Sequence, residues 1–365
     1  MSWPERVIER IDVRPVTIEL TEPFAISGGA PAEARNVFVR VTLRDGSAGY
    51  GEAAPFEAVT GETQAGTLAA LQAVRAAVTG RDAAAWRSLA GDLRCLIPEA
   101  PAARCAVEQA VIDALARHTG LPLIQFFGGC SHELTTDITI PAGDIEHSAS
   151  SARRAVQDGF RTVKVKVGAG DWELDVARLV AISQAAPGLS VVVDANEGYS
   201  YAHARQFLGH VRSAGVTLAL MEQPVVADDV ASLAALEEEF GVPVCADESA
   251  RSPADAIRVA RAGRIGVINI KLMKCGVADA LDMISVARSA GMSCMIGGMI
   301  ETAVSMTFSA ALAMANYPLF AFTDLDTPLF MRNSAIAGGM SYQGPVIRLP
   351  AGAAGTGIDA SGYFA

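Results

Sequence analysis

Short apolar runs recur along the last two thirds of the chain, and most of them end in a charged residue. They occupy residues 137–141, 162–166, 191–194, 217–222, 244–247, 267–271, 293–297 and 320–324. Alanine-rich stretches with helical spacing lie between them. Eight strands that alternate with helices predict an α/β protein with a (β/α)8 barrel. A doubly wound open sheet is the alternative, but it requires G-x-G-x-x-G after a strand, and that motif follows none of these runs.

The first part of the chain has a different pattern, in which strands come first and helices follow. The candidate strands are residues 13–20, 36–44 and 49–54, and the candidate helices are residues 63–78 and 103–119. This order predicts an α+β unit. We expect three parts: an N-terminal α+β domain at 1–130, a barrel at 131–340, and a C-terminal segment at 341–365 that returns to the first domain.

Composition narrows the class of protein. The chain has 365 residues, of which 51% are hydrophobic, so it can bury a large core. Its formal net charge is −11 and no basic run appears, which argues against nucleic acid as a partner. The six cysteines form no C-x-x-C pair. This predicts buried free thiols in a reducing cytoplasm rather than disulfides or a zinc site.

One uncharged stretch, residues 302–323, is long enough to span a bilayer. Asn316, Tyr317 and Pro318 interrupt it, so an amphipathic helix followed by a buried strand explains it better. The first residues, MSWPERVIER, lack the apolar region of a secretory signal. The sequence therefore predicts a cytoplasmic protein without a membrane partner.

Three carboxylates end three consecutive predicted strands: Asp194, Glu222 and Asp247. In a barrel the strand ends form the active-site face, and neighbouring strands are about 4.8 Å apart. Carboxylates gathered there repel one another unless a cation lies between them. Oxygen ligands with room for water and substrate suit Mg²⁺. A structural ion network with nearby lysines is the alternative, but three carboxylates in register favour a magnesium site.

Lysines end two other predicted strands. Lys164 and Lys166 are two residues apart, so both point to the same side of one strand, and Lys271 lies on the opposite wall of the barrel. Two opposed lysines can reach both faces of one flat intermediate. A neighbouring ammonium and a metal ion each lower a lysine pKa towards the range of a general base. Surface lysines on misassigned strands are the alternative, but the flanking apolar residues argue against it.

Five motifs occur in order at these strand ends: Lys164-Val-Lys166, Asp194-Ala-Asn196, Glu222-Gln-Pro, Asp247-Glu248-Ser and Lys271. Together they resemble the enolase superfamily, and within it the muconate-lactonizing subgroup. The likeness covers essentially the whole chain, because the first domain resembles the α+β capping domain of that family. It implies a cofactor, Mg²⁺, bound by the three carboxylates. It also implies acid/base roles for Lys166 and Lys271, and a supporting role beside the substrate carboxylate for Lys164.

The last predicted strand ends in Asp324-Leu-Asp326. Dipeptide epimerases resemble this chain in carrying Asp-x-Asp there, where it holds the free α-ammonium of the substrate. The resemblance therefore implies inversion of the α-carbon of the second residue of a dipeptide, by proton transfer through an enolate. The same subgroup leaves three alternatives open: N-acylamino acid racemase, o-succinylbenzoate synthase and muconate-type cycloisomerase. A structural role, in a turn or as a helix cap, is the alternative for the two aspartates.

Two further polar residues are candidate substrate contacts. Asn196 belongs to the motif of the third strand, and Glu301 follows the seventh strand, where it either lines the pocket or supports residues that do. We expect capping loops near residues 25–35 and 54–62 to exclude water and to read the side chains of the substrate. Relatives that prefer glutamate carry an arginine where this chain has Gly28 or Gly29, so an uncharged or hydrophobic second residue is compatible. The resemblance also suggests a homo-oligomer.

Other classes of function fit less well. A Schiff-base aldolase also uses a barrel lysine, but it has no need of three carboxylates in a row. A barrel that only binds a ligand is expected to have lost at least one of these groups, and this sequence keeps them all. Proton exchange separates the classes, because only a proton-transfer enzyme introduces solvent deuterium into a dipeptide without cleaving it.

Overall fold

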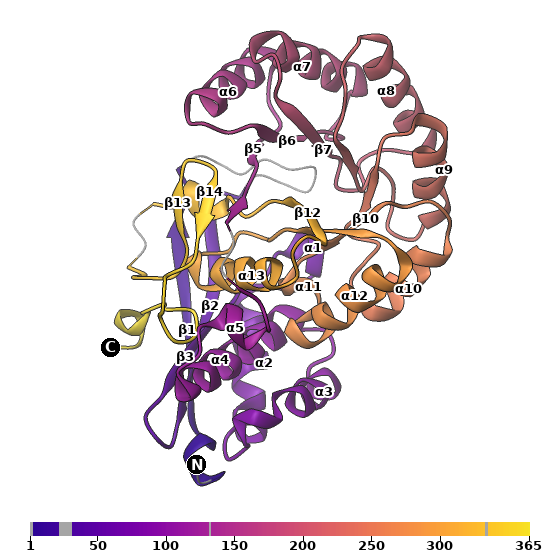
Figure 1. Cartoon of the computed structure of the whole chain (residues 1–365). Coiled ribbons are helices and arrows are strands. Elements are labelled where there is room, and N and C mark those ends of the chain that lie inside the picture. Colours follow the sequence, from indigo (N-terminus) through magenta and orange to yellow (C-terminus); the bar gives the residue numbers. More distant parts are fainter. Residues whose placement is uncertain (1–2, 22–30, 131–132, 333–334) are drawn as a thin grey trace.

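The chain folds into an N-terminal unit of strands and helices and a curled parallel sheet wrapped by helices (Figure 1). The structure is a computed structural model, and it describes residues 3–21, 31–130, 133–332 and 335–365. Eight parallel strands form one sheet in sequence order, from β5 to β12. The predicted TIM-like barrel with an added N-terminal α+β unit is thereby confirmed, in the form of a curled half-barrel.

All eight predicted strands are present, and their bounds differ from the prediction by at most three residues. They are β5 (Ile138–Ile140), β6 (Thr162–Lys166), β7 (Ser190–Asp194), β8 (Leu220–Glu222), β9 (Val244–Ala246), β10 (Val267–Ile270), β11 (Ser293–Ile296) and β12 (Phe320–Thr323). The outer helices are α6 (Ile145–Gln157), α7 (Trp172–Ala185), α8 (Tyr201–Ser213), α9 (Val230–Phe240), α10 (Pro253–Arg261), α12 (Val277–Ala290) and α13 (Ala303–Ala315), with a short α11 (Leu272–Cys275) after β10.

The two ends of this sheet, β5 and β12, meet without a strand ladder between them. The backbone N–H of Asp137 donates to the carbonyl of Thr323 at 3.0 Å. Two residues further along the chain, in β5, the backbone N–H of Thr139 donates to Oδ2 of Asp326 at 2.7 Å. A side chain therefore takes the place of a strand partner at the closure, which brings Asp137 and Asp326 close to each other.

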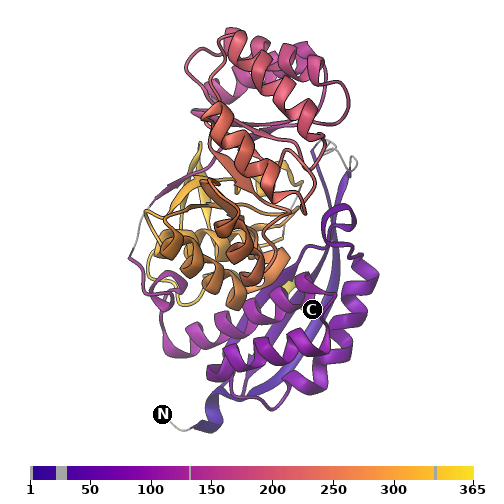
Figure 2. The ribbon, with the colours of Figure 1, turned by 90° about the vertical axis from the view of Figure 1, so that its right-hand side faces the viewer.

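The N-terminal unit is an antiparallel sheet covered by helices (Figure 2). Its strands are β1 (Ile8–Glu19), β2 (Glu33–Leu43) and β3 (Ala48–Ala53), and its helices are α1 (Glu57–Thr60), α2 (Gln64–Val78), α3 (Trp86–Leu96), α4 (Pro101–Thr119) and α5 (Leu123–Phe126). Helices α2 and α4 agree with the prediction, and α3 is an addition to it. The amphipathic α3 begins without a side-chain cap, which removes the usual signal for a helix start.

Helix α4 packs directly on the backbone of β3, because two residues of that strand have no side chain. A Cβ at Gly51 would lie 2.0 Å from the carbonyl oxygen of Ala106, and one at Gly49 would lie 2.1 Å from the backbone nitrogen of Ala114. Both approaches are far shorter than any real contact. Glycine is therefore required at these positions by close packing of helix and strand.

We expect Gly51→Ala to destabilise the protein by about 3 kcal/mol, since overpacking of a core costs about 1–3 kcal/mol or more. Gly91→Ala in α3 is the matched control, because its new Cβ meets no atom within 4 Å. That control should be neutral or slightly stabilising, since alanine is the better helix former. Thermal unfolding of the two variants checks this, and equal midpoints would contradict the packing argument.

The C-terminal segment contacts both units. Strands β13 (Ser341–Gln343) and β14 (Val346–Arg348) form a small sheet with β4 (Leu134–Thr135), which leads into the barrel. The last residues then reach the N-terminal sheet, where the ring of Tyr363 lies 5.0 Å from that of Phe38. The division into 1–130, 131–340 and 341–365 stays a prediction.

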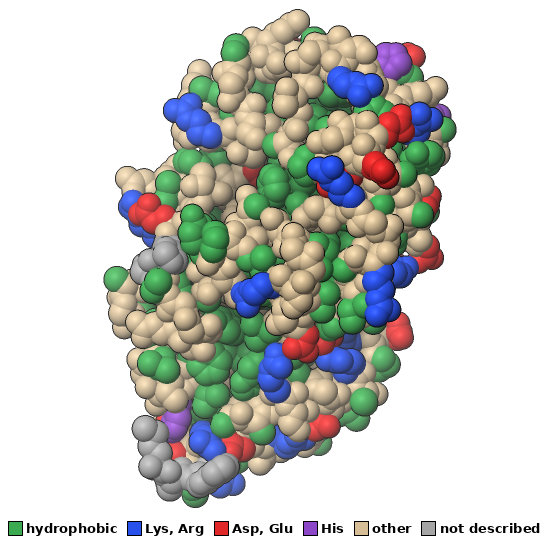
Figure 3. Space-filling view, turned by 45° about the vertical axis from the view of Figure 1, so that its right-hand side comes forward, with side chains coloured by type: hydrophobic (Ala, Val, Ile, Leu, Met, Phe, Trp, Pro, Cys, Tyr) green, Lys and Arg blue, Asp and Glu red, His purple; other side chains and the backbone are tan. Residues whose placement is uncertain are grey.

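The uncharged stretch at residues 302–323 forms helix α13 and strand β12, as predicted. The helix is buried on all sides rather than amphipathic, because it packs between the barrel and the N-terminal unit. No helix within the described ranges has both the length and the apolar character needed to cross a membrane. Four of the six cysteines are buried, whereas Cys95 and Cys130 are exposed, so the prediction of buried thiols holds for four of them. On the face in Figure 3, the charged side chains of both signs are interspersed.

Candidate active site

The predicted carboxylates lie side by side at the strand ends. Asp194 of β7 pairs in register with Glu222 of β8, and Asp247 follows β9, the next strand. All three side chains are fully buried. The backbone turns sharply just beyond two of them, at Asn196 (φ 41°) and Gln223 (φ 32°). Positive φ is uncommon at residues other than glycine, and such strained positions cluster at functional sites.

Every lysine of the chain is gathered around these carboxylates. The sequence has four lysines, Lys164, Lys166, Lys271 and Lys274, and all four are buried. The Nζ of Lys164 lies 3.0 Å from Oδ2 of Asp194 and 2.8 Å from Oε2 of Glu222. Lys166 contacts the same oxygen of Asp194 at 2.7 Å and Oδ1 of Asn196 at 3.1 Å.

The other wall of the barrel holds the remaining two lysines. The Nζ of Lys271 lies 2.6 Å from Oδ2 of Asp247. Lys274, which the sequence analysis did not single out, contacts Oδ1 of Asp247 at 2.5 Å and the carbonyls of Asp247 and Asn269. Its backbone partners suit a lysine that fixes the loop after β10, whereas Lys271 has a single ionic partner among the described residues.

Charge balance in this group is visible in the pKa shifts of the carboxylates. Burial alone would raise the pKa of Asp194, but the ammonium groups of Lys164 and Lys166 outweigh it and hold that pKa well below its usual value. Lys271 and Lys274 do the same for the pKa of Asp247. Glu222 differs, because burial and the charge of Asp194 raise its pKa to about 6. The carboxylates thus depend on nearby cations to stay ionised.

The lysines themselves respond to the same contacts. Burial lowers the pKa of Lys271, but the carboxylate of Asp247 outweighs it and raises that pKa above its ordinary value. The predicted shift is the opposite one, a lysine pKa lowered towards neutrality by a neighbouring ammonium and a metal ion. The pKa of Lys271 is raised instead because its ammonium group contacts the carboxylate of Asp247 directly. A cation that took over Asp247 would remove this effect.

The donor set fits a magnesium ion in its chemistry. It is made of carboxylate oxygens only, which Mg²⁺ prefers. The ammonium of Lys164 between Asp194 and Glu222 demonstrates that a positive charge is accepted there. Whether these three residues bind metal stays a prediction.

A cavity lies above these groups, and it is lined by both predicted acid/base residues. Lys166 and Lys271 line it together with Lys164 and Asn196. Asp324 and Asp326 line it too, on the side of the β5–β12 closure. Lys166 and Lys271, at strand ends that are four strands apart in the sheet, thus line the same cavity.

Apolar residues form the rest of the cavity wall. Phe56 and Val59 come from the loop and short helix after β3, within the predicted capping loop at 54–62, and Met299 and Ile300 come from the loop after β11. The other predicted capping loop, at residues 25–35, is described only from residue 31 onward. Gly28 and Gly29 therefore lie outside the described residues. Met299 and Ile300 are absent from the predicted site, because they belong to a loop without a regular pattern.

The loop after β11 is held in place by the N-terminal unit. Glu52 of β3 accepts hydrogen bonds from the backbone N–H groups of Thr302 and Ser305, and so caps helix α13. Asn36 donates both to Glu52, at 2.6 Å, and to the carbonyl of Ile300, at 2.9 Å. The N-terminal unit therefore positions a wall of the cavity directly.

Glu301, the remaining candidate, is fully buried and does not line the cavity. Its carboxylate accepts the backbone N–H of Met299 and the hydroxyl of Ser305. Burial raises its pKa to about 7. Of the two placements that the sequence left open, the structure favours a supporting one, behind the loop.

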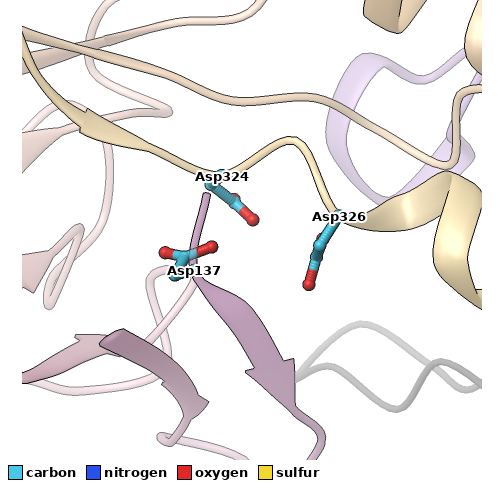
Figure 4. A group of neighbouring side chains, drawn as sticks. All are labelled: Asp137, Asp324 and Asp326. Atoms are coloured by element: carbon cyan, nitrogen blue, oxygen red, sulfur yellow. The ribbon is translucent and has the colours of Figure 1, made fainter. Parts of the chain in front are cut away.

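A second group of carboxylates lies at the closure of the sheet. Oxygens of Asp137, Asp324 and Asp326 lie within 4.8 Å of one another (Figure 4). Lys164 contacts Oδ2 of Asp324 at 2.7 Å, so it links this group to the first one. Burial and the charge of Asp324 raise the pKa of Asp326 to about 7. Asp137 is absent from the predicted site, because the prediction rests on the ends of strands and Asp137 precedes one.

Comparison with known proteins places this site in a family. Residues 9–128 match the N-terminal domain of the mandelate racemase/muconate lactonizing enzymes, and residues 147–363 match the enolase C-terminal domain-like family. The chain belongs to the mandelate racemase/muconate lactonizing enzyme family. The predicted membership of the enolase superfamily is confirmed.

Relatives within this family are epimerases. The aromatic dipeptide epimerase of Herpetosiphon aurantiacus is 47% identical over 96% of this chain and 98% of its own length. The L-Ala-D/L-Glu epimerase of Bacillus subtilis is 34% identical over 96% of each chain. A crystal structure of a dipeptide epimerase from Enterococcus faecalis, complexed with Mg and L-Leu-L-Tyr, has a TM-score of 0.92 and 33% identity over 97% of this chain and 99% of that one. The predicted enzyme class, an isomerase, is confirmed.

Proposed function

We propose that this family member is a magnesium-dependent dipeptide epimerase that inverts the α-carbon of the second residue. The observation that carries the proposal is that two opposed lysines and an Asp-x-Asp pair line one cavity. The lysines suit removal and return of a proton, and the aspartates suit a free ammonium. The names of the relatives support the same substrate class.

Proton transfer falls to Lys166 and Lys271. They stand on opposite walls, so the neutral lysine takes the α-proton from one face and the ammonium of the other returns a proton to the opposite face. No proton is gained or lost overall. Asp194, Glu222 and Asp247 are the proposed ligands of Mg²⁺, which when bound stabilises the negative charge that develops on the substrate carboxylate. Lys164 adds a further positive charge at this position.

The side-chain class follows from the cavity wall. Phe56, Val59, Met299 and Ile300 offer apolar surface, and the lysines are the cationic groups among the described residues that line the cavity. An acidic second residue finds no dedicated partner there. We therefore assign an apolar or aromatic second residue, in line with the aromatic dipeptide epimerase among the relatives.

The test of the proposed ammonium site compares a dipeptide with its N-acetyl counterpart. Asp324→Asn and Asp326→Asn should each raise the KM for L-Ala-L-Phe by about tenfold or more, because a charge-assisted hydrogen bond contributes about 1.5–3 kcal/mol. Neither change should matter for N-acetyl-L-Ala-L-Phe, which has no ammonium. Deuterium uptake at the α-carbon, followed by NMR, measures turnover.

The wild-type protein provides the decisive control for this comparison. It should epimerise the free dipeptide in preference to the N-acetyl compound. The reverse preference would replace the proposal with an N-acylamino acid racemase, which acts on substrates without the ammonium.

A further inference from the structure

Asp137 is a buried carboxylate that the proposed reaction leaves without a role. It directly precedes β5, and the residue is 3% exposed. Figure 4 shows it facing Asp324 and Asp326, which reach the same space from the segment after β12. One oxygen of each residue lies within 4.8 Å of the others.

This group of three has too few cationic partners. Within the described part of the chain, Lys164 is the lysine that contacts it, through Asp324. The same Nζ also contacts Asp194 and Glu222, so its charge is shared. A buried carboxylate without a compensating charge is costly. The group is therefore short of positive charge.

Two of its oxygens also lack donors. Oδ1 of Asp137 and Oδ1 of Asp326 are buried, and neither has a hydrogen-bond partner among the described residues. The other oxygen of Asp326, Oδ2, already accepts a hydrogen bond from the backbone N–H of Thr139. The space between the carboxylates thus calls for a ligand that brings both positive charge and several donors.

We propose that Asp137 is a third carboxylate of the ammonium subsite, which positions the N-terminus of the substrate from behind Asp324 and Asp326. This inference rests on the proposed dipeptide substrate. A primary ammonium brings one charge and three N–H donors, which matches the charge and donors that the group lacks. It enters from the cavity, which Asp324, Asp326 and Thr139 line. Asp137 attracts it by charge and takes no part in proton transfer.

The test removes the charge of Asp137 and keeps its shape. Asp137→Asn should raise the KM and the Kd for L-Ala-L-Phe by about fivefold or more, because a charge within about 5 Å is lost from a buried site. The kcat should stay within about twofold, since the reacting carbon is untouched. Asp158→Asn, at an exposed position after α6, is the matched control and should change neither constant.

Two further variants and a binding measurement distinguish the possible outcomes. Asp326→Asn reports on the proposed ammonium site itself, so a raised KM there with an unchanged KM in Asp137→Asn overturns the role of Asp137 alone. Calorimetry gives the Kd for the dipeptide even if the protein binds dipeptides without epimerising them. The ratio of the Kd values of Asp137→Asn and wild type therefore tests the role of Asp137 separately from the proposed epimerase activity. Should asparagine prevent folding, Asp137→Ser offers a smaller neutral side chain for the same comparison.

A divalent cation is the competing occupant. Equilibrium dialysis of the wild type against Mn²⁺ counts the sites directly. If one site is lost in Asp137→Asn and the affinity for the dipeptide is unchanged, the group is a metal site and the inference is wrong. An unchanged number of sites together with weaker dipeptide binding supports it.

Discussion

Lys166→Ala and Lys271→Ala should each lower the kcat for epimerisation of L-Ala-L-Phe by about 10³-fold or more, since a positioned acid or base contributes about 10²–10⁴-fold. In the proposed mechanism each lysine serves one face of the α-carbon, so the loss of either is expected to stop inversion. Both variants should fold. Each substitution leaves the buried carboxylate with a second lysine, because Asp194 keeps its contact with Lys164 and Asp247 keeps its contact with Lys274.

Deuterium exchange distinguishes the two lysines. The variant that keeps the base for one epimer should still exchange the α-proton of that epimer with solvent, and the other variant should show the opposite preference. NMR of L-Ala-L-Phe and L-Ala-D-Phe in D₂O measures both. Normal epimerisation by either variant would show that the acid/base pair lies elsewhere.

Removal of metal should abolish activity with little effect on the fold. Asp194 and Asp247 each contact lysines, so the protein itself neutralises these carboxylates when no metal is bound. Dialysis against EDTA should therefore eliminate epimerisation while thermal unfolding stays cooperative, and added Mg²⁺ should restore the rate. Calcium is the matched control, because it prefers longer bonds and more ligands than Mg²⁺.

Full activity in protein verified to be free of metal would contradict this prediction. Recovery with Ca²⁺ equal to that with Mg²⁺ would contradict the narrower claim of a small octahedral site. Metal content measured by elemental analysis accompanies each assay, so that residual metal is not mistaken for metal-independent activity.

Much of the barrel was predictable because its signals are local. Each strand is a short apolar run, and Asp194, Glu222 and Lys271 stand at the ends of such runs, where the barrel places its active site. The parallel sheet in chain order then brings them together without further information. The same logic predicted helix α13 within an uncharged stretch, although its complete burial depends on a neighbour from the other domain.

The remaining features depend on contacts between distant parts of the chain. Glu52 caps a helix that begins about 250 residues later, and nothing near Glu52 in the sequence indicates that partner. Asp137 lies before a strand, at the end of the barrel opposite to the one where active sites form, and it reaches the site only because β5 and β12 close without a ladder. Such residues become visible only when the closure itself is known.

The burial of all four lysines has a consequence for chemical labelling. The basic side chains of the exterior are arginines, so a reagent directed at amines meets no exposed lysine that would consume it. Apart from the N-terminal amine, every amine of the chain lies beside the carboxylates of one site. The extent of amine modification therefore measures how open that site is, and a ligand that fills the cavity would protect the whole lysine complement at once.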